Sequence, residues 1–142
     1  MNTLSIIGRV IFSIPFFVFG TNHFLNTAAM AAYVPPFIPG PVIWVYALGA
    51  AMILAGLCII TSFLGETASI CLALMLLTFV VTIHIPGLFN PEIRQIVFVN
   101  LFKDLGLLGG ALVIAGSFHK AKADKAAKEQ EIMRKSFLDR AA

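Results

Sequence analysis

Five polar side chains stand inside long apolar stretches of the sequence and could together do chemistry. Two are histidines, and the other three lie close together near the start of the last apolar stretch: His23, His84, Asn100, Lys103 and Asp104. Polar and ionisable groups are costly in an apolar surrounding, so each is a functional hypothesis. Two histidines beside a lysine and an aspartate could move a proton or form hydrogen bonds with the carbonyls of a quinone head group.

Helical spacing shows which of these side chains share a helix face, although it does not give the order of the helices and so leaves open whether His23 and His84 converge. Asn100, Lys103 and Asp104 are related as i, i+3 and i+4, so they share one side of a helix. Glu66 and His84 are 18 residues apart, about five helical turns, and therefore share a face at opposite ends of a helix. Three helices could thus direct polar groups into one cavity, which would hold a ligand or a proton site.

A second polar layer is expected at the opposite end of the same stretches. Arg9 begins a stripe at helical spacing whose further members are Ser13, Phe16, Gly20 and His23. Arg9 can extend to lipid headgroups, and Glu66 can cap the third stretch at its positive dipole end. A direct pair between Arg9 and Glu66 would lower the cost of both, so we expect a structural polar pair here.

Other interpretations of the polar residues stay open. Lys103 and Asp104 could neutralise each other in a structural network, with the histidines bonded to backbone carbonyls. His23 and His84 could ligate a metal or haem, but no sequence motif supports such a site. Cys58 and Cys71 lie in apolar runs without a Cys-x-x-Cys spacing and are expected to be buried free thiols.

The composition places these residues in a membrane. Of 142 residues, 59% are hydrophobic and only 12% are charged, with a mean hydropathy of +0.94. Soluble domains carry about 25% charged residues. The composition therefore excludes a disordered protein, a soluble enzyme and a nucleic-acid-binding domain, and the partner it predicts is the lipid bilayer.

The apolar runs divide into four predicted spans, at about residues 4–25, 42–63, 66–85 and 96–118. A proline-rich segment, residues 35–41, separates the first two because no helix can cross it intact. The runs are too long and too uniformly apolar for barrel strands. The predicted fold is an all-α integral membrane four-helix bundle, residues 1–118. The first run resembles a signal peptide only weakly and is interpreted as a span.

The remaining segment, residues 119–142, is predicted to form a short charged helix. It holds seven basic and four acidic residues, a net charge of 7 − 4 = +3. Basic flanks favour the cytoplasm, so both termini are expected there and the proline-rich loop outside, packed into the bilayer interface or over the bundle as a lid. Ile132, Met133 and Phe137 could lie on the inner leaflet, or the segment could be a solvated helix or a frayed end. Gly106-x-x-x-Gly110 and Ala47, Ala51 and Ala55 are expected to allow close helix packing.

The run from Asn100 to Leu112 resembles the fourth-span signature of the DoxX family. That signature is an aromatic residue, then Lys-Asn or Lys-Asp, then a run of small residues and leucine ending in Gly-Gly, here Phe102-Lys103-Asp104 and Gly109-Gly110. Residues 20–24 resemble the Gly…His/Lys-Phe end of the family's first span. An early Arg9, a proline-rich loop and a histidine near the end of the third span agree with it.

The resemblance implies a four-helix membrane protein whose relatives include subunits of membrane oxidoreductases and assembly proteins. It implies that Lys103 and Asp104 are the core of the motif and that Arg9 and His23, in the first span, belong to the family pattern as well. We expect a redox-linked subunit of the bacterial cytoplasmic (inner) membrane that binds quinone. The alternative is a non-catalytic assembly or scaffold protein with partner subunits or further copies of itself. A small multidrug-type transporter is disfavoured because the first span holds no acid.

Overall fold

The computed structural model of the chain describes residues 3–141, and this part of the chain contains helices and no strand. The helices are, in order, α1 (Thr3–Leu25), α2 (Thr27–Ala31), α3 (Pro41–Thr61), α4 (Gly65–Phe79), the π-helix η1 (Val80–His84), α5 (Ile85–Gly87) and α6 (Arg94–Ala141). The elements α4, η1 and α5 follow one another without a gap and act as one rod.

Four helical segments, here called rods, are long and apolar enough to cross a membrane: Thr3–Leu25, Pro41–Thr61, Gly65–Gly87 and the apolar part of α6. Their leucine, isoleucine, valine and phenylalanine side chains cover the outside of the bundle, where many are more than half exposed. Such a surface is suited to lipid chains. The predicted all-helical fold is confirmed, and it contains four helices compatible with a membrane bundle.

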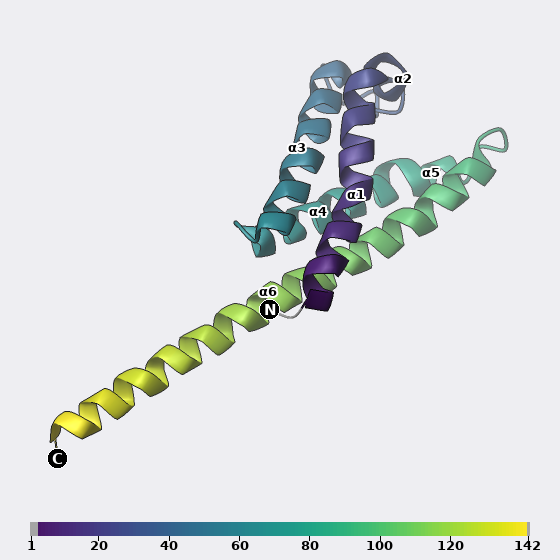
Figure 1. Cartoon of the computed structure of the whole chain (residues 1–142). Coiled ribbons are helices and arrows are strands. Elements are labelled where there is room, and N and C mark those ends of the chain that lie inside the picture. The colour runs from purple at the N-terminus through teal and green to yellow at the C-terminus, as the bar shows by residue number, and fades with distance from the viewer. Residues whose placement is uncertain (1–2, 142) are drawn as a thin grey trace.

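The four rods associate as two pairs (Figure 1). Helix α1 packs along α3, and α4 packs along α6, while contacts between α3 and α4 join the pairs. A tight turn, residues 62–64, connects α3 to α4, with Ser62 and Leu64 at positive φ of 62° and 52°. We call the end of the bundle with this turn the turn end. The opposite end, where α1 ends and α6 begins, is the cavity end.

The interior follows the stripes that helical spacing predicts. The buried residues of α1 are Arg9, Ser13, Phe16 and Gly20, four of the five members of the predicted stripe. Between the helices lies a small apolar core, made of Phe16, Met52, Ile59, Leu72, Ala73, Leu76 and Ala111. Because few side chains are buried, close backbone approach contributes much of the packing.

Two glycines allow α1 and α3 to approach closely. A Cβ atom added at Gly20 would lie 2.8 Å from the carbonyl oxygen of Gly49, and one added at Gly49 would lie 3.0 Å from the carbonyl oxygen of Gly20. The expected Gly106-x-x-x-Gly110 contact is only half correct. Gly110 packs on the ring of Phe12, whereas Gly106 has no neighbour within 4 Å because it faces outward.

Helix α6 runs past the bundle as one element (Figure 1). The expected short charged helix is therefore not a separate element: residues 119–141 extend the fourth rod, and Ala142 lies outside the described residues. At 1.5 Å per residue this extension projects about 35 Å beyond Phe118. Ile132, Met133 and Phe137 are exposed along it, so the straight helix carries them away from the rods.

Candidate functional site

A cavity of about 740 Å³ opens at the cavity end of the bundle. Helices α1, α3, α4 and α6, the π-helix η1 and the segment after α2 all contribute to its wall. The five polar residues singled out from the sequence line it together: His23, His84, Asn100, Lys103 and Asp104. The structure thus brings both histidines to the same space as the Lys-Asp pair of α6.

Asp104 is the centre of the polar wall. Only 5% of the residue is exposed. His84 donates from Nε2 to Oδ2 of Asp104 across 2.8 Å, and the ammonium of Lys103 lies 3.4 Å from Oδ1. A buried carboxylate needs such partners because an unpaired charge in an apolar surrounding is costly. The three side chains form one linked group, here called the His84–Asp104–Lys103 triad.

The π-helix η1 positions His84. The backbone N–H of Ile85 donates to the carbonyl of Val80, five residues earlier, which is the π-helical pattern. Pro86 follows directly and cannot donate a backbone hydrogen bond, so the helix must adjust near it. The adjustment leaves His84 on the same side of the rod as Glu66, facing α6, as the 18-residue spacing predicts.

His23 is held by its own helix. Its Nδ1 lies 2.7 Å from the backbone carbonyl oxygen of Phe19, and a carbonyl only accepts, so Nδ1 is the donor. The ring of Phe19 carries a second contact, because the ammonium of Lys103 lies 4.3 Å from its centroid. Phe19 therefore contacts two of the charged or titratable residues of this wall, His23 and Lys103. As one phenylalanine in an apolar helix, it gave no signal in the sequence.

Two asparagines complete the polar lining. Asn100 is half-buried, and its side-chain amide makes no hydrogen bond to the rest of residues 3–141. An amide offers both donors and an acceptor, so Asn100 can serve a ligand of either polarity. Asn22 also lines the cavity, and its side-chain oxygen accepts from Asn26 one turn later. The cavity thus contains one uncommitted amide.

The rest of the cavity is apolar and is covered by the proline-rich segment. Phe16, Met52 and Leu76 contribute to the walls, and the covering residues are Tyr33, Val34, Pro35 and Pro36. The indole of Trp44 donates to the carbonyl of Pro39 across 3.1 Å, which ties the end of this segment to α3. An apolar cavity with a few polar groups on one wall is typical of a small-molecule site.

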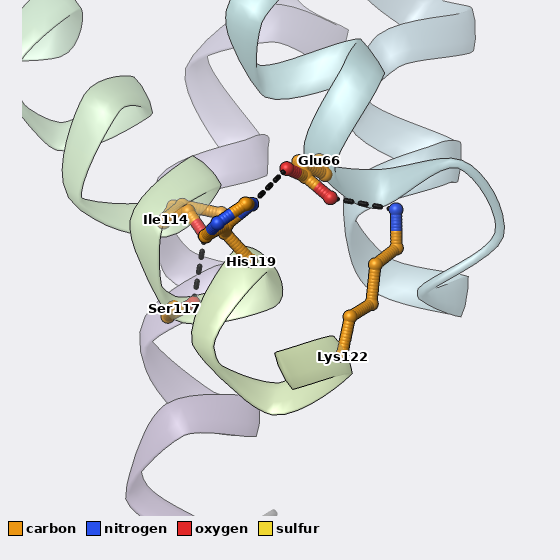
Figure 2. Close-up of polar contacts among 5 residues, drawn as sticks. All are labelled: Glu66, Ile114, Ser117, His119 and Lys122. Atoms are coloured by element: carbon orange, nitrogen blue, oxygen red, sulfur yellow. Dashed lines mark hydrogen bonds and ion pairs between the residues drawn. The ribbon is translucent and has the colours of Figure 1, made fainter. Parts of the chain in front are cut away.

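At the turn end, Arg9 and Glu66 have separate partners, which corrects the expectation of a direct pair. Arg9, only 3% exposed, donates to Ser62 Oγ across 2.7 Å, and its guanidinium lies 4.9 Å from the ring centroid of Phe118. Glu66 accepts from His119 at 2.9 Å and from Lys122 at 2.6 Å (Figure 2). The continuous α6 helix supplies both partners of Glu66. The sequence analysis ended the fourth span at residue 118, so it did not predict these contacts.

Neither a metal-binding cluster nor a disulfide occurs within residues 3–141. Within residues 3–141, no group of three histidine, cysteine, aspartate or glutamate residues lies close enough to hold a metal ion. Both cysteines are free. Cys58 is half-buried and Cys71 is exposed, which corrects the expectation that both are buried: Cys71 lies on the outer, apolar side of α4.

The four apolar rods and the enclosed polar wall define a multi-pass helical membrane protein. The family model DoxX matches residues 4–85, more than half of the chain, and the chain belongs to this family. The match covers α1, α2, α3, α4 and η1 and ends at the first residue of α5, before the Lys103-Asp104 motif of α6. No curated protein and no solved structure shows significant similarity to the chain.

Proposed function

We propose that this DoxX family protein is a redox-linked subunit of the bacterial cytoplasmic membrane that binds a quinone or a similar apolar ligand in the cavity. The observation that supports the proposal is the position of one polar wall inside an otherwise apolar cavity. Ligand cavities for drug-sized molecules measure about 300–1,000 Å³, and this one measures about 740 Å³. A substituted aromatic ring with part of an apolar tail fits this size.

The position of the polar wall suggests how the ring and the polar head of such a ligand would be oriented. The ring of the ligand would lie against Phe16, Met52 and Leu76, with its polar head at the part of the wall that Lys103 and His23 line. Asp104 orients Lys103 through the 3.4 Å contact and holds His84 through the 2.8 Å bond. Asn100 is a second polar group for the head of the ligand. No catalytic residue is assigned, because binding is the only step that these groups support.

The charge of the α6 extension sets the proposed orientation. Residues 119–142 carry a basic excess, and basic flanks favour the cytoplasmic side. Both termini then lie in the cytoplasm, and the cavity lies in the outer half of the membrane beneath the proline-rich segment. A ligand that resides in the bilayer would enter from the lipid and not from the cytoplasm.

A lysine substitution tests the proposal. Lys103→Met keeps the length and apolar stem of the side chain and removes the ammonium, so binding of a short-chain benzoquinone to the purified protein in lipid discs should be abolished. Lys128→Met, on the exposed extension of the same helix, is the matched control and should bind as the unchanged protein does. Undiminished binding by the Lys103 variant, with intact helical content, would refute the assignment.

The length of the α6 extension favours a second candidate, a non-catalytic assembly protein. The extension is exposed along its whole described length and bears apolar side chains at Ile132, Met133 and Phe137. A partner subunit or a further copy of the chain could bind there. A defined complex recovered in mild detergent and lost on deletion of residues 119–142 would support this candidate, provided that the cavity binds no quinone.

A further inference from the structure

The hydrogen bonds of the two histidines determine which form of ligand the cavity accepts. We infer that it prefers a ligand whose oxygen carries a hydrogen, a hydroquinone or related phenol, over the corresponding carbonyl compound, and that His23 determines this preference. The inference rests on the proposed ligand site and adds the chemical form of the ligand. It involves binding only, and no electron or proton leaves the ligand.

His23 lines the cavity and has one ring nitrogen that can accept a hydrogen bond. Its Nδ1 must carry a hydrogen because its partner, the carbonyl of Phe19 at 2.7 Å, can only accept. In a neutral imidazole the other nitrogen then has a lone pair and no hydrogen. This atom, Nε2, makes no hydrogen bond to any residue in the described part of the chain. His23 can therefore form a hydrogen bond with a ligand group that donates a hydrogen.

Lys103 is a donor toward the same region. Its ammonium has three hydrogens, and one contact, to Asp104 at 3.4 Å, occupies part of this capacity. The side chain is 37% exposed and lines the cavity, so further donors are accessible to a ligand. The position over the ring of Phe19, at 4.3 Å, keeps the ammonium beside α1.

Phe19 contacts both the residue that offers the acceptor and the residue that offers the donor. Its carbonyl accepts from His23 and its ring contacts the ammonium of Lys103, and all three residues line the cavity. A hydroxyl group satisfies both, because its oxygen accepts from the ammonium while its hydrogen is donated to Nε2. A carbonyl oxygen satisfies Lys103 alone and leaves two acceptors, its own lone pair and that of His23, facing each other.

His84 does not supply a hydrogen-bond donor that would favour the carbonyl compound instead. Its Nε2–H is already donated to Asp104, and its Nδ1 is a buried atom with no hydrogen-bond partner among residues 3–141. With Nε2 as the donor, the Nδ1 of a neutral imidazole has only a lone pair to offer. In this form neither histidine has a free N–H to donate to a quinone carbonyl.

The test compares three probes of nearly equal shape on the full chain in lipid discs. They are a short-chain benzoquinone, its hydroquinone kept under anaerobic conditions, and the dimethyl ether of that hydroquinone, which accepts hydrogen bonds but cannot donate them. One hydrogen bond to an otherwise unsatisfied acceptor corresponds to about a tenfold change in affinity. We expect the hydroquinone to bind about tenfold more tightly than either other probe.

A variant assigns the preference to a residue. His23→Phe keeps a planar ring and removes the acceptor, so the affinities for hydroquinone and quinone should converge to within about twofold, while the quinone still binds. His119→Phe, at the turn end, is the matched control and should keep the tenfold preference. Failure of all three probes to bind the unchanged protein would overturn the proposed function itself.

The remaining outcomes concern the inference alone. Equal affinity of the unchanged protein for hydroquinone and quinone would overturn the preference and leave the ligand site standing. A preference that persists in His23→Phe would overturn the role of His23. Because the dimethyl ether comparison needs no variant, the inference stays testable even if His23→Phe does not fold.

Discussion

His84 and Asp104, 20 residues apart in the chain, are joined by a 2.8 Å hydrogen bond between the last turn of a π-helix and the first turns of α6. The bond fixes three things at once. It fixes the tautomer of His84, supplies one of the two partners of a buried carboxylate, and ties the third rod to the fourth at the cavity end. The family match reaches His84 and stops short of Asp104, so this contact joins the matched part of the chain to the rest.

The first prediction concerns the charge of that carboxylate. Asp104→Asn keeps the shape and the acceptor for His84 but leaves Lys103 without its neighbouring anion. Breaking a buried ion pair by removing one partner is strongly destabilising, and the partial exposure of Lys103 reduces the cost. We expect a loss of about 2 to 3 kcal/mol, measured by detergent-induced unfolding followed by circular dichroism.

Glu129→Gln is the control for this measurement. Glu129 pairs with Lys125 on the exposed extension at 3.9 Å, and exposed pairs of this type contribute well under 1 kcal/mol. Its unfolding curve should coincide with that of the unchanged protein. If Asp104→Asn also unfolded at the unchanged detergent concentration, the triad would not be part of the stabilising structure.

The second prediction concerns the close approach of α1 and α3. The Cβ of Gly49→Ala would lie 2.7 Å from Cβ of His23 and 3.0 Å from the carbonyl oxygen of Gly20, so the helices must separate. Overpacking of this kind costs about 1–3 kcal/mol. The same unfolding assay should show this loss, and movement of His23 should also weaken ligand binding at the cavity.

Gly106→Ala provides the contrast. Nothing lies within 4 Å of the added Cβ, and alanine is the better helix former by about 0.5–1 kcal/mol. The variant should therefore be neutral or slightly stabilised. Equal damage from both substitutions would show that Gly106 packs against something in the membrane, such as another copy of the chain.

Much of the bundle follows from helical spacing alone. The stripe through Arg9, Ser13, Phe16 and Gly20 is buried because a period of 3.6 places these residues on one face. The facing of Glu66 and His84 toward α6 follows from the same period. Depth in the predicted spans placed Lys103, Asp104 and the two histidines in one polar layer. Spacing does not give the order of the helices, so the meeting of both histidines in one cavity is visible only in the structure.

Other features depend on contacts that the sequence does not encode locally. The pairing of Glu66 with His119 and Lys122 requires α6 to continue beyond Phe118. The charged composition after that residue marks the end of the apolar run, but no glycine or proline follows Gly116 to end the helix. The role of Phe19 also depends on tertiary contact, because its carbonyl and ring serve different partners.

The third prediction concerns the attachment of the α6 extension. Glu66 accepts from His119 and Lys122 at the point where α6 leaves the bundle (Figure 2). Glu66→Gln removes the charge that holds both partners, so the extension should fray from this point. We expect faster amide hydrogen exchange in residues 119–126, with exchange in residues 96–112 unchanged. Unchanged exchange in both segments would mean that the helix backbone alone holds the extension.

The last prediction concerns orientation in the membrane. With both termini in the cytoplasm, Phe37→Cys in the proline-rich segment should react with a membrane-impermeant thiol reagent on intact bacterial cells. Ser136→Cys on the α6 extension should react only after the cells are opened. Both positions are exposed in the structure. Whether the reagent reaches each cysteine therefore depends on the side of the bilayer on which that position lies. The unchanged protein is the control, because it measures any labelling of the native Cys58 and Cys71, which lie within α3 and α4. The reverse labelling pattern would place the cavity on the cytoplasmic half and would contradict the orientation that the basic extension predicts.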